Sequence, residues 1–151
     1  MRIFNFICLG ICALLLISCA DEPEGLEGAG VYVLIDGEEW RADDYNVTIN
    51  RNEGFYRLVA TNSTEDSLLE IEVEDTQIGD YDNQNARITY QSGSQVYRSD
   101  DSEIGINVAR ISNSEGITAG TFEGQLTSPG QDEMIELENG EYDGVTFVEI
   151  D

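Results

Sequence analysis

Apolar and polar residues alternate with a period of two along most of the chain after residue 30. The clearest example is the stretch 67–74, where Leu69, Ile71 and Val73 alternate with glutamates. This spacing places the apolar side chains on one face of a strand and the glutamates on a face that meets water. No window of 12 residues after the N-terminal 18 carries the apolar stripe of a helix, so the pattern predicts a domain built from strands.

Turn signals separate the alternating stretches. Asp36-Gly37 and Asn139-Gly140 are two-residue hairpin sequences, and polar turns are expected at 51–54, 62–66 and 112–116. Residues 79–85 form a polar loop. The segment 91–103 is rich in Ser and Asp around an apolar step at Val96-Tyr97, which is consistent with either a hairpin or a mobile loop.

About ten short strands with hairpin connections indicate an all-β domain, either an antiparallel β-sandwich or a flattened β-barrel. The sequence leaves both architectures open. Trp40 follows the first hairpin and is expected in the core, with stacking on a ligand as the alternative role.

The N-terminus has the form of an export signal. Arg2 precedes an apolar run over 3–17, which is too short to span a membrane. The run ends in Leu16-Ile17-Ser18-Cys19, which resembles the bacterial lipobox. The resemblance implies a signal peptide over 1–18 and a diacylglycerol on Cys19. Composition and the strand pattern then indicate a tether up to residue 30 and one β-domain over 31–151. The alternative is an ordinary cleaved signal that leaves Cys19 as a chance thiol.

The tether is acidic and rich in glycine, beginning Ala20-Asp21-Glu22-Pro23-Glu24. It resembles the signal that sends Bacteroidota lipoproteins to the outer face of the outer membrane. A solvated tether would have the same composition. We therefore expect a lipid-anchored outer-membrane protein at the cell surface, with the periplasmic face as the alternative.

The charge narrows the range of partners. Residues 19–151 hold six arginines and no lysine against all 31 acids, a formal charge of −25. Such a chain is repelled by nucleic acid and by anionic lipid. The acidity has two explanations, solubility in a saline environment or the binding of divalent cations such as Ca²⁺.

Missing residue types exclude much of enzyme chemistry. The chain has no histidine, and all cysteines other than Cys19 lie within 1–18. This removes imidazole bases, zinc sites built on histidine, thiolate nucleophiles and disulfides from the domain. Catalysis would have to use Asp, Glu, Tyr, Ser, Thr or Arg.

Three acidic segments are candidate cation sites. The segment 80–85 places oxygen side chains at alternate positions, but an EF-hand needs Gly at the sixth position and Glu at the twelfth, where this chain has Asn85 and Gln91. The alternatives that remain for this loop are an irregular Ca²⁺ site and a plain polar turn, and the same alternatives apply to Asp43-Asp44 and to 100–103.

Asp66-Ser67-Leu68 resembles a Bacteroidota O-glycosylation tripeptide, although a turn entering a strand explains it equally well.

The two ends of the domain resemble a known group of proteins. Gly120-Thr121-Phe122, followed by a strand, Asn139-Gly140 and Tyr142, is similar to the ending of small Bacteroidota lipoproteins classed as domains of unknown function. A strand, Asp36-Gly37 and Trp40 resemble their start. The resemblance implies a β-rich surface lipoprotein, and it transfers no catalytic residue.

These observations predict a non-catalytic structural or binding accessory anchored through Cys19, with no cofactor beyond the Ca²⁺ considered above. Its partner could be a glycan, a small apolar ligand or another protein. One alternative is a lipocalin-like carrier, which requires an apolar cavity. A less favoured alternative is a glycosidase that uses two carboxylates across a scissile bond.

Overall fold

The computed structural model describes residues 28–100, 102–130 and 133–150, and this part of the chain forms eleven strands and no helix. No helix of the described part could therefore cross a membrane. The predicted signal peptide, Cys19 and most of the predicted tether lie outside the described residues. The strands in chain order are β1 (Gly30–Ile35), β2 (Glu38–Arg41), β3 (Asp44–Asn50), β4 (Phe55–Asn62), β5 (Ser67–Val73), β6 (Gly79–Tyr81), β7 (Ala86–Ser92), β8 (Gln95–Arg98), β9 (Ile104–Ser112), β10 (Ile117–Thr127) and β11 (Met134–Ile150).

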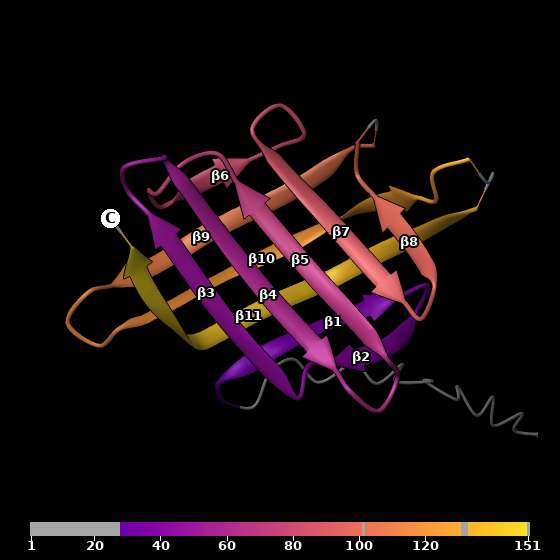
Figure 1. Cartoon of the computed structure of the whole chain (residues 1–151), viewed down its shortest axis with the longest axis horizontal. Coiled ribbons are helices and arrows are strands. Elements are labelled where there is room, and N and C mark those ends of the chain that lie inside the picture. The colour runs from indigo at the N-terminus through magenta and orange to yellow at the C-terminus, as the bar shows by residue number, and fades with distance from the viewer. Residues whose placement is uncertain (1–27, 101, 131–132, 151) are drawn as a thin grey trace, which may run out of the picture.

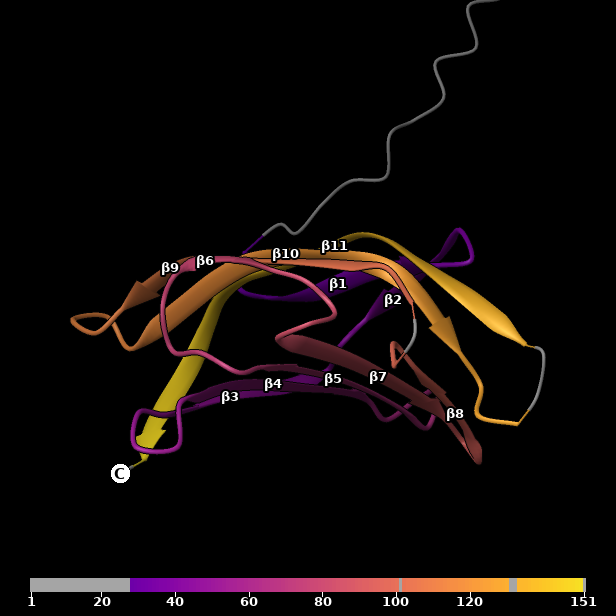
Figure 2. The same ribbon diagram turned by 90° about the horizontal axis from the view of Figure 1, so that it is seen from above.

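The strands form one mostly antiparallel sheet that folds over itself into two layers. The order is β2-β1-β11-β3-β4-β5-β7-β8-β10-β9-β6, and β11 also pairs with β10. Figure 1 shows the long strands of the two layers crossing one another, and Figure 2 shows β1, β2, β6, β9, β10 and most of β11 in one layer and β3, β4, β5, β7 and β8 in the other.

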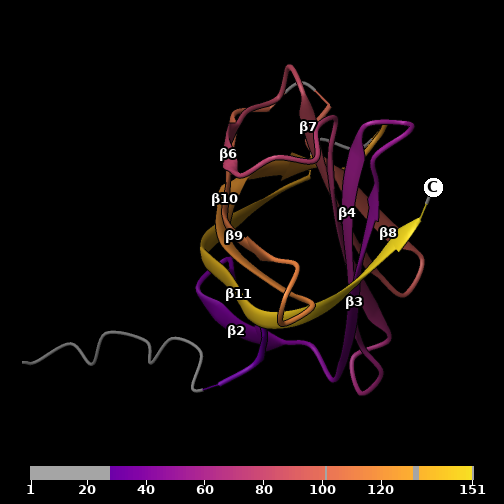
Figure 3. The same ribbon diagram turned by 90° about the vertical axis from the view of Figure 1, so that its left-hand side faces the viewer.

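Strand β11 belongs to both layers. Its first part pairs with β1 and β10, and its last residues, 147–150, pair in parallel with residues 47–50 of β3. On the other side of the ring, β8 and β10 share the single register pair Arg98 and Thr127. The sheet therefore closes only partly (Figure 3), so the molecule combines features of the sandwich and of the flattened barrel.

The all-β prediction and the alternation that supports it are confirmed. In β5, Leu69, Ile71 and Val73 are fully buried, whereas the glutamates between them are partly exposed. Trp40 is 2 % exposed, which places it in the core as expected, and its ring meets that of Tyr90 edge to face at 6.2 Å. The largest fully buried side chains, drawn from both layers, are Trp40, Tyr32, Tyr56, Tyr142, Phe122, Ile49, Leu58, Leu69, Ile71, Ile88, Leu126 and Leu137.

Two of the predicted turns show why their sequences fold as they do. Asp36 and Gly37 have φ values of 52° and 80° and join β1 to β2 with Ile35 paired to Glu38. Positive φ at both central residues is the type I′ hairpin that Asp-Gly favours. Residues 91–103 contain the hairpin rather than only a mobile loop, because Ser92 of β7 pairs with Gln95 of β8.

The predicted hairpin at Asn139-Gly140 is wrong, because both residues lie inside the continuous strand β11. Asn139 has φ 52°, but Gly140 does not share this conformation, as a type I′ turn would require. Phe122 pairs with Gly140 and Gly124 with Leu137, so the register between β10 and β11 shifts by one residue here. Asn139 is therefore the left-handed residue of a β-bulge. Asn tolerates positive φ, and this tolerance serves a bulge here instead of a hairpin turn.

Gly140 is needed at this bulge for a different reason. A Cβ atom on Gly140 would clash with the carbonyl oxygen of Phe122 and would lie 2.6 Å from its ring. A further left-handed residue, Gly144 with φ 58°, precedes the part of β11 that pairs with β3. Bulges of this kind bend a strand, which explains how β11 passes from one layer to the other.

Three hydroxyl groups lie buried between the layers near this bend. Thr118 Oγ1 donates to the carbonyl of Arg110 at 2.8 Å, so Tyr56 Oη is the donor in its 3.2 Å hydrogen bond to Thr118 Oγ1. Tyr142 packs against Tyr56, but its hydroxyl has no partner with hydrogen-bond geometry among the described residues. Burial raises the pKa of Tyr56 to about 12 and also raises the pKa of Tyr142.

Candidate functional site

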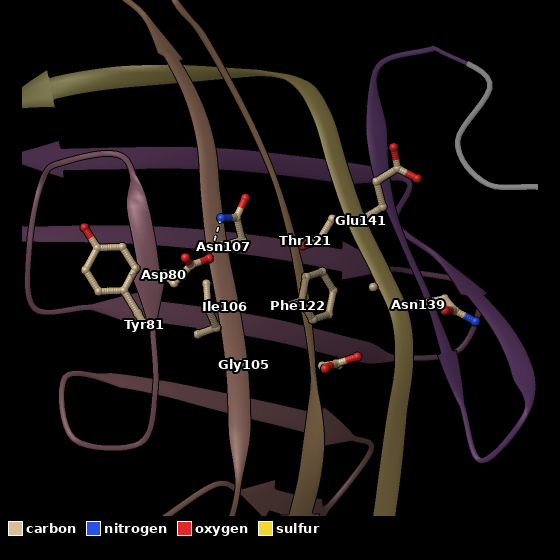
Figure 4. A pocket seen from close by; sticks show the side chains of 11 residues that line it. Asp80, Tyr81, Gly105, Ile106, Asn107, Thr121, Phe122, Asn139 and Glu141 are labelled. Carbon is tan, nitrogen blue, oxygen red and sulfur yellow. Dashed lines mark hydrogen bonds between the residues drawn. The ribbon is translucent and has the colours of Figure 1, made fainter.

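A polar groove crosses the solvent-facing side of the layer that contains β6, β9, β10 and β11. It has a volume of about 480 Å³. Figure 4 shows its lining side chains, which come from these four strands. The polar side chains of the lining are Asp80, Asn107, Thr121, Glu123, Asn139 and Glu141.

The alternation of β9 and β10 positions the groove. Ile106 and Phe122 turn inward to the core, so their neighbours Asn107, Thr121 and Glu123 face outward. Gly105 also occupies an outward position, and a Cβ atom there would meet Glu123 at 3.7 Å. The missing side chain at Gly105 leaves the backbone of β9 as the floor of the groove.

One edge of the groove is fixed by a hydrogen bond between two strands. Asn107 Nδ2 of β9 donates to Asp80 Oδ1 of β6 at 2.6 Å, as the dashed line in Figure 4 marks. The opposite edge is the bulge of β11, which carries Asn139 and Glu141. The groove therefore lies between an interstrand side-chain hydrogen bond on one side and the bulged strand β11 on the other.

A second depression of about 510 Å³ continues the groove along the same face and shares Gly105, Glu123 and Asn139 with it. It adds carboxylates from the ends of the same strands. Together the two parts, here called the acidic groove, are lined by six acids, Asp80, Glu103, Glu123, Glu136, Glu138 and Glu141, and by no arginine among the described residues. The arrangement suits a ligand that donates hydrogen bonds or carries positive charge.

The prediction of a polar loop over 79–85 is wrong at its start, because residues 79–81 form β6 by pairing with the edge of β9. Of the segment 80–85 considered for Ca²⁺, Asp80 accepts from Asn107, and the turn 82–85 uses two of its side-chain oxygens internally. Asp82 Oδ1 accepts from the backbone N–H of Gln84 at 2.9 Å, and Asn85 Oδ1 accepts from that of Asp82 at 3.1 Å. These are bonds of the kind that Asp and Asn make in polar turns. Within the described residues no group of three or more Asp or Glu side chains is placed to hold a metal ion.

Of the two other predicted cation segments, Asp43-Asp44 makes structural contacts through Asp43. Asp43 Oδ2 accepts from both the backbone N–H and the hydroxyl of Ser63, and these bonds lower the pKa of its carboxyl. They join the start of β3 to the turn after β4. Asp44 begins β3, whereas Asp101 of the segment 100–103 lies outside the described residues.

Ser67 of the glycosylation-like tripeptide faces the core. Its hydroxyl accepts a 2.8 Å hydrogen bond from Trp40 Nε1, and the residue is 6 % exposed. The folded domain therefore does not present this hydroxyl to a modifying enzyme, and the same bond satisfies the indole nitrogen of the buried Trp40.

The sequence did not identify the acidic groove. Its members are ordinary outward positions of strands, and they meet only because β10 lies between β9 and β11. The hairpin expected at Asn139-Gly140 would have broken β11 and removed one wall. A usable signal was Gly105 between the apolar residues Ile104 and Ile106, because glycine inside a strand often marks close approach of another group.

The model of one protein family, described as "Domain of unknown function (DUF6252)", matches residues 29–146, which include every residue that lines the acidic groove. Searches of curated proteins and of solved structures gave no significant match. Because the family model covers most of the chain, the protein belongs to the family described as Domain of unknown function (DUF6252).

Proposed function

We propose that the protein is a non-catalytic binding accessory that is held at the outer membrane by a lipid on Cys19 and binds a basic segment of a partner through the acidic groove. The observation that carries this proposal is the continuous groove with six carboxylates and no arginine among its described lining residues. Charge of one sign in a groove raises the local concentration of an oppositely charged ligand and speeds its association.

The exposure of the groove acids supports binding rather than catalysis. Glu103, Glu123 and Glu136 are exposed to water. A carboxylic acid that works as a general acid needs an apolar, shielded environment. Exposed carboxylates on rigid strands are better suited to forming ion pairs at the rim of an interface.

The filled interior supports an accessory over a carrier. A carrier of a small apolar ligand needs a cavity of at least about 300 Å³. The space between the two layers of this domain is occupied by one contiguous cluster of buried side chains that includes Trp40, Phe122 and Leu126.

The test is the affinity of the purified domain for a lysine-rich peptide at low salt. The variant Glu123→Gln/Glu138→Gln/Glu141→Gln should bind the peptide about tenfold more weakly, because it removes three charges from the groove. The control variant Glu38→Gln/Glu74→Gln/Glu115→Gln removes the same charge at exposed positions outside the groove lining. Equal weakening in both variants would show that only net charge attracts the peptide and would refute the groove as a site.

The location is tested separately on intact cells. Protease added outside the cells should digest the domain if it is displayed on the surface. Digestion only after lysis would place the domain on the periplasmic face.

A further inference from the structure

A second, smaller groove lies on the solvent-facing side of the other layer. It has a volume of about 230 Å³ and is lined by side chains of both signs: Glu70, Glu72, Arg87, Thr89, Arg98 and Asp100. Strands β5, β7 and β8 supply all of these except Asp100, which follows β8 closely. None of these residues lines the acidic groove.

Strand register brings the two arginines to the same spot. Thr89 of β7 pairs with Arg98 of β8 on one side and with Glu70 of β5 on the other, and Arg87 pairs with Glu72. Arg87 and Thr89 are two residues apart on one strand, so both side chains point outward. Thr89 is therefore next to Arg87 along the outer face of β7 and next to Arg98 across to β8.

The strand end that carries Arg98 is held firmly. Ser99 is 2 % exposed, its Oγ accepts from the backbone N–H of Ile88 at 2.9 Å, and its own N–H donates to the carbonyl of Ile88 at 3.1 Å. Arg98 is also the residue at which β8 meets β10. The backbone on this side of the groove is therefore held in place before a ligand binds.

Arg87 and Arg98 differ from the other arginines of the domain in their partners. Arg51, Arg57 and Arg110 form ion pairs of 2.8, 2.5 and 3.1 Å with Glu149, Glu70 and Asp143, and Arg41 interacts with Glu39. Neither Arg87 nor Arg98 has a carboxylate oxygen within 4.0 Å in the part of the chain that the structure describes. Among the described residues these two guanidinium groups thus differ from those of the other four arginines in having no carboxylate partner, although the chain holds 31 acids.

The chemistry of the lining fits a ligand with one anionic group and several hydroxyls. Guanidinium groups bind carboxylates with paired hydrogen bonds, whereas carboxylate side chains accept hydrogen bonds from hydroxyls. Glu70 already forms an ion pair with Arg57, so Glu72 and Asp100 are the carboxylates that can accept hydrogen bonds from a ligand. The volume is that of a small polar molecule.

We propose that this groove binds a carboxylated sugar residue of an acidic glycan, with the carboxylate between Arg87 and Arg98 and the ring hydroxyls on Thr89, Glu72 and Asp100. Charges at the groove balance, because Arg87, Arg98 and the Arg57 that pairs with Glu70 offset the three lining carboxylates. Repulsion between the anionic sugar and acids farther away is screened beyond about 8–10 Å at physiological salt. The site does not depend on the acidic groove, so each proposal can fail without the other.

The test is a titration of the purified domain with D-glucuronate, followed by amide chemical shifts in NMR spectra. Shifts should concentrate at residues of β5, β7 and β8, and the variant Arg87→Gln/Arg98→Gln should weaken binding by about tenfold or more. The control Arg51→Gln/Arg110→Gln removes the same charge elsewhere and should leave the affinity for glucuronate within about twofold. The positions of unaffected peaks verify that each variant is folded.

Two further probes separate the parts of the proposal. Glucose should bind more weakly than glucuronate because it lacks the carboxylate, and acetate should bind more weakly because it lacks the hydroxyls. Equal affinity for acetate and glucuronate would show that the groove is an adventitious ion site only and would overturn the sugar proposal. No shifts in β5, β7 and β8, or equal affinity in Arg87→Gln/Arg98→Gln, would overturn the proposal outright.

Discussion

At the scale of single residues, most polar side chains buried in the fold have a specific hydrogen-bond partner. Trp40 was expected in the core from its place after the first hairpin, but the sequence could not show that Ser67, 27 residues away, would accept its indole N–H. Such a pairing depends on which strands become neighbours, and that information is not local.

Replacing Ser67 by Ala should destabilise the domain. The buried Trp40 Nε1 would lose its acceptor, and an unsatisfied buried donor costs about 1–3 kcal/mol. Urea unfolding of Ser67→Ala, compared with Ser94→Ala in the exposed turn between β7 and β8, measures this loss. An unfolding free energy unchanged from that of the unmodified domain would show that the bond contributes nothing.

The buried Tyr56 should make the domain sensitive to alkali. Its folded pKa of about 12 lies above the ordinary value of 10.0, so its contribution to stability is complete below pH 10 and is lost as pH rises toward 12. The slope is up to about 1.4 kcal/mol per pH unit. Between about pH 9 and about pH 11, the melting temperature of Tyr56→Phe should fall less than that of the unmodified domain. The control variant is Tyr45→Phe, whose melting temperature should fall as much as that of the unmodified domain. Parallel curves for Tyr56→Phe and the unmodified domain would contradict the assignment.

At the scale of elements, alternation and turn chemistry predicted most of the strands. Alternation succeeded in β5 because the layer is covered on one face only. The failure at Asn139-Gly140 has a physical cause: the same left-handed preference of Asn serves a hairpin turn or a bulge, and only the strands on both sides of β11 decide between them.

The bulge gives a direct prediction. Asn139→Ala should lower the free energy of unfolding by about 1–2 kcal/mol, since alanine tolerates the left-handed conformation poorly. Asn139→Gly should stay within about 0.5 kcal/mol of the unmodified domain, because glycine adopts positive φ readily. Chemical denaturation measures both variants. If Ala and Gly had the same effect, position 139 would not need its left-handed conformation.

At the scale of the whole molecule, the strong negative charge should destabilise the compact state through self-repulsion. The formal net charge of the chain is −24. Raising NaCl from about 0.01 M to about 0.15 M shortens the screening distance from about 30 Å to about 8 Å, so the melting temperature should rise. A falling melting temperature would mean that the few surface ion pairs outweigh the repulsion.

The candidate sites were less predictable than the fold, for a reason that also lies at this scale. Sequence patterns identified clusters of neighbouring acids such as 80–85, whereas both grooves are built from residues on separate strands. Glu123, Glu138 and Glu141 come from β10 and β11, and Arg87 and Arg98 from β7 and β8. Only the pairing of the strands brings them together.

The proposed accessory role requires attachment to a membrane, and the lipid on Cys19 is its premise. The most direct measurement is mass spectrometry of the N-terminal peptide from protein purified from the envelope of its own cells. We expect a mature chain that starts at Cys19 and carries the mass of a diacylglycerol together with an acyl group. A chain that still begins at Met1, or one with an unmodified thiol at Cys19, would contradict the account.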